Sequence, residues 1–411
     1  YKNIVTGCIS WNNIGQDIEG DLENVSYSCF IEADGSNNNI RANPLFKNTS
    51  GDPSTWDFHL QNGSPCIDNG NLDDFPLTDF EGNSRPGADG KVCMGAYESP
   101  NEFEPSEPVP AIIYVSKTGN NSDGSSWENA FNTITSATLS VSGDDLFEIW
   151  VAEGIYKEGR EITVEKRVSL YGGFEGNETE LSQRNIENHE SIIDGESKHR
   201  CFVNYNILNG FSITSGYNDN RGGGVRNYGG VISHCIVYNC KSDSRGGGIY
   251  DENGKVEKCK IFDNESSFGG GVYTQNGLIT KSFLYNNHAN AAGGIANNRG
   301  LVRNCIIYKN NVNEEGGGIG NYGTVINCTV FNNSSGSREG GGAFNKEDII
   351  NCIIWNNIGG DIFNETFYLR NPFVKYSCFS EADGLHHNIS SDPMFVNVSG
   401  DPSTWDFRLQ N

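Results

Sequence analysis

The chain has 411 residues, of which 53 are acidic and 29 basic, giving a formal net charge of −24. Nucleic acid and anionic membrane surfaces are therefore poor partners, because both carry charge of the same sign. No apolar run approaches the roughly 18 residues that a spanning helix requires, so we expect no membrane span in this segment.

Residues 1–98 are predicted to be the closing turns and end cap of one domain, because three of their segments recur near the other end of the chain. The matching pairs are CISWNNIGQDI (8–18) with CIIWNNIGGDI (352–362), YSCF (27–30) with YSCF (376–379), and GDPSTWDFHLQN (51–62) with GDPSTWDFRLQN (400–411). The offset is 344 residues at the first pair and 349 at the last. We expect residues 111–411 to be a second copy lacking its terminal cap, and both to belong to a longer tandem array.

A spacer separates the two predicted copies. Residues 99–110 (SPNEFEPSEPVP) contain four prolines and three glutamates. Such a composition favours an extended, semi-rigid linker between folded units.

A single short helix is predicted near the start of the second copy, after a strand over residues 112–116. Ser125 and Glu128 have the spacing of a capping box. The residues that then fall on one helical face are Trp127, Ala130, Phe131, Ile134 and Ala137. This helix would cover the open first turn of the domain, whose unpaired strand edges would otherwise favour aggregation.

Glycine runs then recur at a fixed spacing of 23 or 24 residues. The runs are 222–224, 246–248, 269–271, 293–294, 316–318 and 340–342. A period between 20 and 50 residues is typical of a solenoid, in which each repeat buries its apolar face only by stacking on its neighbours. We expect the glycines to allow sharp turns, and replacement of Gly317 by valine to damage one of them.

A cysteine column in the same register identifies the kind of solenoid. Its members are Cys235, Cys259, Ser282, Cys305, Cys328 and Cys352, each followed two residues later by an aliphatic residue and three later by an aromatic one. The shared parity of the first two positions indicates strands that face a core. Within a repeat, no segment has the length or the 3.6-residue apolar period of a helix. The sequence therefore predicts an all-β, right-handed parallel β-helix.

The cysteines of this column are expected inside the coil as reduced thiols, where cysteine behaves as a small hydrophobe. Outside the column, the sequence does not decide whether Cys66 and Cys93 form a disulfide. A further column follows the glycine runs and consists of Asn227, Asp251, Thr274, Asn297, Asn321 and Asn345. Stacked amides at such a position can hydrogen-bond from one turn to the next, so we interpret the column as architecture.

These motifs carry a family resemblance. The alternation of Gly-Gly-x-[Ile/Val] runs with [Phe/Tyr/Trp]-x-Asn resembles the repeats of polymorphic outer-membrane proteins. The whole chain is similar to the large secreted β-helix proteins of Bacteroidetes-type bacteria. The segments that carry this second likeness are YVSKTGNNSDGSSWENAF (114–131), IWVAEGIY (149–156), YGGFEGNETELSQRN (171–185), SIIDG (191–195), SPCIDNGN (64–71) and EGNSRPGADGKVCMGAYE (81–98).

The resemblance implies a pectin-lyase-like fold, secretion and display at the cell surface. It implies no activity, because that fold carries lyases, hydrolases and adhesins alike. The chain departs from the pattern at Cys93, where related end caps usually carry Asp.

No catalytic, cofactor-binding or metal-ligating residue is predicted. A lyase needs a base beside carboxylates or Ca²⁺, yet the column of Arg221 and Arg245 continues with Phe268 and Ala292. Asp251 has Asn227 and Thr274 as column neighbours and gains no acidic partner. The seven histidines form no column, and no CxxC pair occurs.

Two features leave alternatives open. Glu315 and Glu339 fall on adjacent turns with Glu314 beside them, either as a cation site or as exposed turn residues. Tyr228, Tyr250, Tyr273 and Tyr322, taken as exposed, could stack on sugar rings. The positions just after the glycine runs vary too much to predict one continuous aromatic stripe: Arg226, Tyr250, Tyr273, Ala296 and Gly320.

The sequence therefore favours a structural and interaction protein over an enzyme. We expect a rod or fibre of tandem β-helix domains, extracellular and displayed on a bacterial surface, that acts as an adhesin and requires no cofactor. Its expected partners are other copies of itself, and glycans or receptors on the surface of host or neighbouring cells. The alternative is an extracellular β-helix protein that binds or degrades polysaccharide as a lyase or hydrolase.

Overall fold

The computed structural model describes residues 5–11, 13, 17–18, 24–50, 55–72, 75–87, 90–99, 110–143, 145–337, 339–364, 374–399 and 404–410. The chain divides into two compact units, Tyr1–Pro108 and Val109–Asn411. The fold is mostly β, a parallel β-solenoid of about 14 turns with one short α-helix in the described residues. The predicted all-β parallel solenoid is thus confirmed.

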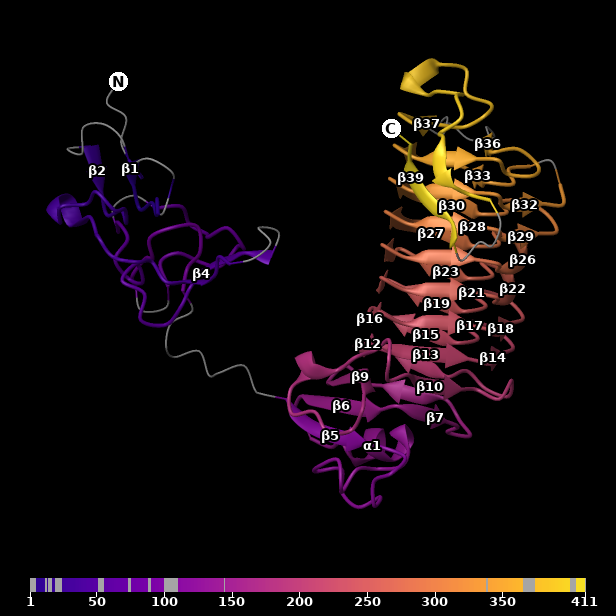
Figure 1. The fold of residues 1–411 in the computed structure, drawn as a ribbon, viewed down its shortest axis with the longest axis horizontal. Coiled ribbons are helices and arrows are strands. Elements are labelled where there is room, and N and C mark those ends of the chain that lie inside the picture. Colours follow the sequence, from indigo (N-terminus) through magenta and orange to yellow (C-terminus); the bar gives the residue numbers. More distant parts are fainter. Residues whose placement is uncertain are drawn as a thin grey trace. The chain divides into compact units, whose positions relative to one another are not determined.

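The second unit is the main solenoid, and its strands stack as successive rungs (Figure 1). The largest described sheet has 18 strands. They are β5 (Ala111–Val115), β6 (Phe147–Ala152), β8 (Ile162–Val164), β9 (Val168–Phe174), β11 (Phe202–Asn204), β12 (Ile207–Asn209), β15 (Val225–Tyr228), β16 (Val231–Ser233), β19 (Ile249–Glu252), β20 (Lys255–Glu257), β23 (Val272–Gln275), β24 (Leu278–Thr280), β27 (Ile295–Arg303), β30 (Ile319–Ile326), β33 (Ala343–Asn345), β34 (Ile349–Ile350), β36 (Ile362–Asn364) and β37 (Val374–Lys375).

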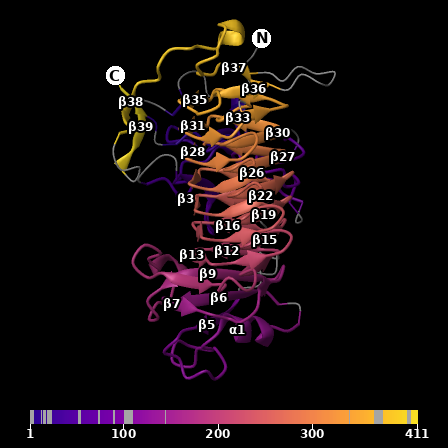
Figure 2. The same cartoon turned by 90° about the vertical axis from the view of Figure 1, so that its right-hand side faces the viewer.

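Two further sheets complete the coil (Figure 2). A sheet of nine strands contains β7 (Gly154–Tyr156), β10 (Ser191–Asp194), β13 (Phe211–Thr214), β17 (Ile236–Tyr238), β21 (Lys260–Phe262), β25 (Phe283–Tyr285), β28 (Ile306–Tyr308), β31 (Thr329–Phe331) and β35 (Ile353–Trp355). A sheet of six contains β14 (Tyr217–Asn218), β18 (Lys241–Ser242), β22 (Glu265–Phe268), β26 (His288–Ala291), β29 (Asn311–Val312) and β32 (Ser334–Ser335). Each strand pairs in parallel with the equivalent strand of the next rung.

The core lies inside the coil, where apolar columns run from rung to rung. Cys235, Cys259, Cys305, Cys328 and Cys352 are only 1–2% exposed, as predicted. None of the twelve cysteines is bridged, so the Cys66–Cys93 disulfide left open above is not formed. In the first unit both residues belong to a small core with Cys29, whose thiol donates to the carbonyl oxygen of Ala42 over 3.1 Å.

Glycine is required at the turns for two physical reasons. The leading residues Gly222, Gly246, Gly269, Gly316 and Gly340 have φ values of 66, 66, 68, 71 and 67°, which side chains other than glycine disfavour. At Gly317 the reason is contact, because a Cβ would lie 2.3 Å from the carbonyl oxygen of Gly341 and 2.5 Å from that of Ser334.

Two polar columns run through the buried interior. The predicted column is confirmed, since Asn227 donates to Asp251 over 2.7 Å and Asn297 to Asn321 over 2.8 Å. The other begins at Asn264, whose side chain donates to Asn287 over 3.0 Å. It continues through Asn310, Asn333 and Asn357 at 2.9, 2.9 and 3.0 Å. Each amide thereby satisfies buried groups of the adjacent rung.

The helix is present but begins later than predicted. Helix α1 (Ile134–Ser140) is N-capped by Thr133, whose side chain accepts from the Ser136 N–H. The predicted capping box at Ser125 and Glu128 is wrong. Ser125 instead donates from its backbone N–H and its hydroxyl to Asp123, and the chain then enters the sheet as a bridge between Phe131 and Val115.

Two residues of the predicted helical face nevertheless pack onto the first turns of the solenoid, where the helix was expected. Ile134 and Ala137 are fully buried and join the solenoid core. Figure 1 shows α1 beside β5 at the end of the solenoid. Trp127, which lies outside the helix, donates from Nε1 to the carbonyl oxygen of Glu178 over 2.9 Å.

The second unit ends in a hairpin that follows the short 3-10 helix η5 (Leu385–His387). Strands β38 (Phe395–Asn397) and β39 (Asp406–Leu409) pair antiparallel, with Phe395 opposite Leu409. Aromatic rings of the hairpin pack against an aromatic column of the nine-stranded sheet. The ring centroids of Trp405 and Phe407 each lie 5.7 Å from that of Tyr308. This contact covers the outer face of the last rungs.

The first unit contains the corresponding elements. Strands β1 (Val5–Thr6) and β2 (Val25–Ser26) pair in parallel, and the 3-10 helix η2 (Ser36–Asn38) follows. Strands β3 (Phe46–Asn48) and β4 (Asp57–Leu60) then form an antiparallel hairpin, with Phe46 opposite Leu60.

Candidate functional site

One outward-facing column of the 18-stranded sheet changes character along the solenoid. Successive rungs place Arg226, Tyr250, Tyr273, Ala296, Gly320, Phe344 and Phe363 at equivalent positions. The small residues Ala296 and Gly320 interrupt a series of large side chains. The result is a cavity of about 260 Å³, which we call the notch.

Aromatic rings close the two ends of the notch along the column. The ring of Tyr273 is stacked on that of Tyr250, with centroids 5.3 Å apart and planes 7° apart. At the other end Phe344 is stacked on Phe363, at 5.6 Å and 15°. Because rungs repeat at about 4.8 Å, three steps separate Tyr273 from Phe344 by about 14 Å.

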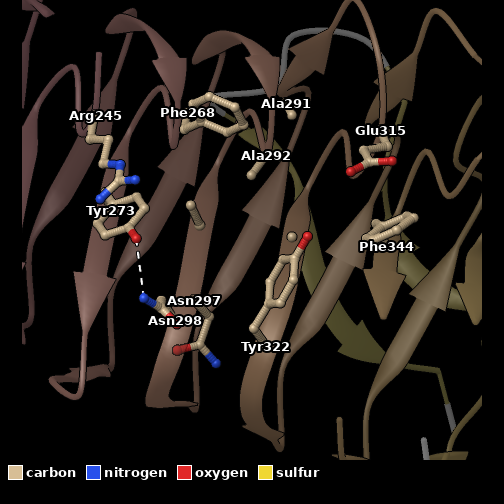
Figure 3. Close-up of a pocket in the computed structure, with 12 residues that line it drawn as sticks. Arg245, Phe268, Tyr273, Ala291, Ala292, Asn297, Asn298, Glu315, Tyr322 and Phe344 are labelled. Carbon is tan, nitrogen blue, oxygen red and sulfur yellow. Dashed lines mark hydrogen bonds between the residues drawn. The ribbon is translucent and has the colours of Figure 1, made fainter. Parts of the chain in front are cut away.

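Polar groups lie around the rim of the notch (Figure 3). The Arg245 guanidinium lies over the Tyr273 ring, 4.9 Å from its centroid. The Asn298 side chain donates to the Tyr273 hydroxyl over 3.2 Å. Tyr322 and Glu315 also line the notch, and the Tyr322 hydroxyl points toward the row of turns that carries Ala292 and Glu315.

The wall on the turn side contains a conformational exception. Ala292 has φ 58° at the position where the other runs begin with glycine. An L-residue in this region costs roughly 1–2 kcal/mol. A Cβ at Gly320 would lie 2.9 Å from the Ala292 methyl, so the two residues fit each other only because position 320 is glycine.

The tyrosines named from the sequence differ in exposure. Tyr250 and Tyr273 were expected to be exposed, which is wrong, because they are 0% and 8% exposed. Ring stacking and the covering arginines bury them, and burial raises the pKa of the Tyr250 hydroxyl. Tyr228 is half-buried and Tyr322 is exposed. The sequence correctly predicted that no continuous aromatic stripe follows the glycine runs. The small residues Ala296 and Gly320, which interrupt the column, are the signal that could have located the notch.

The charged residues singled out in the sequence lie on adjacent rungs. Arg221 and Arg245 occupy neighbouring rungs, with Phe268 next, as predicted. Arg221 lies over the Tyr250 ring at 4.9 Å and donates to its hydroxyl over 3.2 Å. The turns of Glu315 and Glu339 are adjacent, since the Gly316 N–H donates to the Glu339 carbonyl oxygen. Among the described residues, no group of three His, Cys, Asp or Glu side chains is arranged to hold a metal ion.

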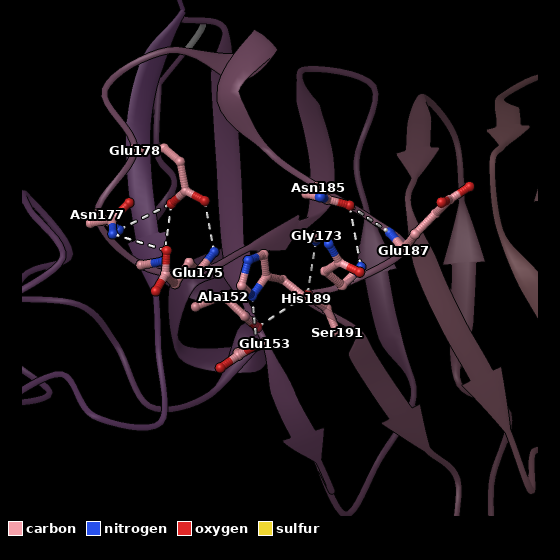
Figure 4. A network of polar contacts seen from close by, with 12 residues as sticks. Ala152, Glu153, Gly173, Glu175, Asn177, Glu178, Asn185, Glu187, His189 and Ser191 are labelled. Atoms are coloured by element: carbon pink, nitrogen blue, oxygen red, sulfur yellow. Dashed lines mark hydrogen bonds and ion pairs between the residues drawn. The ribbon is translucent and has the colours of Figure 1, made fainter.

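A second polar cluster lies near the start of the solenoid (Figure 4). The Glu178 carboxylate accepts from the backbone N–H groups of Glu175, Gly176 and Asn177 at 2.7, 3.0 and 3.0 Å. Burial opposes ionisation, but these donors outweigh it and lower the pKa of Glu178. His189 hydrogen-bonds to Glu153 over 2.7 Å, which raises the pKa of His189. These bonds fix the loop before η4 (Leu181–Gln183), so the cluster is structural.

Comparisons with known proteins show likeness at the level of the fold. No protein-family model and no curated protein matches the chain. Among solved structures, the chain is similar to the pectate lyase Pel9A, with 14% identity and a TM-score of 0.46 over 73% of this chain and 89% of that one. In the part of the chain that the structure describes, no helix is long and apolar enough to cross a membrane.

Proposed function

We propose that the chain is part of an extracellular structural and adhesive protein, built as a rod of tandem β-helix domains on a bacterial surface. One observation carries the proposal: the closing elements occur twice, with nearly the same sequence and the same local structure. We also propose that the chain is related to the secreted β-helix proteins of Bacteroidetes-type bacteria. This likeness rests on the motifs quoted above.

The duplicated segments agree down to single hydrogen bonds. Asn48 donates to the Thr55 carbonyl oxygen and Asn397 to that of Thr404, each over 3.3 Å. In the same way, Asn39 donates to Val25 over 2.8 Å and Asn388 to Val374 over 2.7 Å.

Copying a whole module suits a rod better than an enzyme. Solenoid length grows linearly with the number of repeats. Each added copy also multiplies weak contacts, so avidity can rise without any strong single site. Other copies of the module and glycans or receptors on neighbouring cells are the partners that we propose.

Polysaccharide binding is the second candidate, and the notch is the observation that favours it. Degradation has less support. A lyase base would need carboxylates or a bound cation beside it, whereas Arg221 and Arg245 are each occupied over a tyrosine ring. The polar side chains of the two interior columns are likewise hydrogen-bonded from rung to rung.

The proposal is tested by deleting the gene in the producing bacterium and measuring attachment of the cells to surfaces and to one another. We expect attachment to fall and to return on complementation. In parallel, the purified protein is incubated with polygalacturonate and with neutral polysaccharides, and we expect no shortening of the chains. Normal attachment together with product formation would replace the structural proposal by the enzymatic one.

A further inference from the structure

At one end of the second unit, Tyr376, Ile389 and Leu409 form an apolar surface, which we call the end face. We infer that the end face is a docking site for a second copy of residues 64–98, the segment that covers the equivalent surface of the first unit. This goes beyond the proposed structural function, because it concerns how a single module is closed and holds whether or not modules assemble into a rod.

The end face is exposed although its side chains are apolar. Tyr376, Ile389 and Leu409 are 55, 57 and 55% exposed. Strand β37, which directly precedes Tyr376, lies at the opposite end of the solenoid from α1 (Figure 1). Large apolar side chains gathered on a surface mark an interaction site.

The same positions are covered in the first unit. Leu60, the counterpart of Leu409, is only 8% exposed, and the counterparts Tyr27 and Ile40 are half-buried. The local fold is not the cause, because the hairpins β3–β4 and β38–β39 pair in the same register. The difference comes from residues 64–98, which pack against the first of the two surfaces.

Residues 64–98 contact the first unit through a small apolar core. Cys66, Cys93 and Met94 are at most 1% exposed and belong to one cluster with seven residues that precede them. All seven recur unchanged in the second unit. The residues Ile9, Trp11, Tyr27, Cys29, Ile40, Phe46 and Leu60 correspond to Ile353, Trp355, Tyr376, Cys378, Ile389, Phe395 and Leu409. The second unit therefore offers the same apolar side chains to the same segment.

Close contacts of the segment with its surface make the fit specific. A Cβ on Gly95 would lie 2.8 Å from Cδ1 of Ile9, so the segment approaches Ile9 closely only because this position is glycine. The Ser64 hydroxyl donates to the carbonyl oxygen of Pro44 over 2.6 Å. Pro44 recurs as Pro393, so the second unit has the same backbone acceptor in its sequence.

The charges at the rim of the two surfaces also agree. In the first unit, Nε2 of His59 lies 3.2 Å from the Glu81 carboxylate, and the Tyr97 ring stacks on the His59 ring with centroids 4.0 Å apart. The second unit has Arg408 at this position, with its side chain 84% exposed. A guanidinium can both pair with a carboxylate and stack on an aromatic ring, so Arg408 suits the same two contacts.

The segment also has internal contacts that order it. Arg85 and Glu98 form an ion pair at 3.0 Å, with both side chains 5% exposed. Arg85 donates as well to the carbonyl oxygen of Gly95 over 2.9 Å, which fixes the glycine that approaches Ile9. A segment that is ordered by its own contacts loses less conformational entropy on docking.

The test joins a second copy of residues 63–98 to the end of the chain, so that it follows residues 410–411 as it follows residues 61–62. Hydroxyl-radical footprinting read by mass spectrometry compares the extended chain with the original one. We expect Leu409 to be labelled about sevenfold more slowly in the extended chain, because its exposure should fall from 55% to the 8% of Leu60. Peptides of the two hairpins are told apart by His59 and Arg408.

Two variants of the extended chain make the result specific, with circular dichroism as the check that each remains folded. Leu409→Asp places a charge in the contact and should return the labelling of Ile389 to that of the original chain. Leu385→Asp is the matched control and should keep Ile389 protected. Leu385 is 61% exposed, and its counterpart Ser36 is exposed and polar beside the bound segment.

Equal labelling of Leu409 in the original and the extended chain would overturn the inference. Dimerisation of the original chain that Leu409→Asp abolishes, measured by analytical ultracentrifugation, would also overturn it, because the occupant would then be the end face of another molecule. Neither result bears on the rod, which is judged by attachment and microscopy.

Discussion

At the scale of single residues, the interior is stabilised by side-chain amides that serve two neighbouring rungs. Asp251 is the only acid in its column, in which most rungs have asparagine and one has Thr274. It accepts from Asn227 over 2.7 Å and from the Thr274 hydroxyl over 2.9 Å. Burial nevertheless raises the pKa of Asp251 to about 6, against the effect of these donors.

This shift predicts how stability depends on pH. The pKa is raised from 3.8, so the folded chain binds more protons than the unfolded chain between about pH 4 and pH 6, and stability falls as pH rises through that window. At 1.36 kcal/mol per pKa unit, the loss above pH 6 is about 3 kcal/mol. Asp251→Asn should recover up to this amount at pH 8, because the amide can accept from Asn227 and donate to Thr274.

Urea unfolding at pH 4, 6 and 8 measures this effect. The exposed Asp219→Asn removes the same charge at the surface and should change the unfolding free energy by no more than about 0.5 kcal/mol. The assignment would fail if Asp251→Asn were less stable than the wild type at pH 8.

At the scale of elements, each rung depends on close backbone approach at its glycine turn. A side chain at Gly317 would meet two carbonyl oxygens of the next rung at 2.3 and 2.5 Å. Backbone atoms cannot yield as the end of a flexible side chain can, so the strain must spread to neighbouring rungs.

Gly317→Val should therefore lower the unfolding free energy by about 1–3 kcal/mol or more. Thr324→Val is the matched control, because it places the same side chain on the outer face of β30, where Thr324 is half-buried. Thermal unfolding followed by circular dichroism compares the two. A melting temperature unchanged in Gly317→Val would refute the structural role of this glycine.

Much of this level of structure could be predicted because it repeats. Six copies of one pattern fixed which side chains face inward, and the buried cysteine and asparagine columns follow from parity and spacing. The start of α1 was mispredicted because Ser125 and Glu128 match a local capping motif, whereas pairing of Phe131 with Val115 holds that stretch in the sheet. Local propensity was overridden by a tertiary contact.

The notch was not predicted because it arises from missing side chains. Ala296 and Gly320 appear in the sequence as irregularities in a column, and only the stacked planes of Tyr250 and Tyr273 show that the gap has aromatic walls. The burial of these two tyrosines likewise depends on Arg221 and Arg245, which lie at a different position of the repeat.

At the scale of the whole molecule, the number of repeats determines the length of the solenoid. Each repeat of 23 or 24 residues adds about 4.8 Å to a solenoid while its width stays constant. A tandem array of such units, joined by spacers like residues 99–110, would therefore grow in length alone. One such hairpin, β3–β4 or β38–β39, occurs in each of the two units.

Electron microscopy of the native full-length protein, taken from the cell surface or the medium, tests this central claim most directly. We expect extended rods or fibres of constant width, in which β-helix segments recur at a regular interval with short spacers between them. Compact globular particles containing a single complete domain would contradict it.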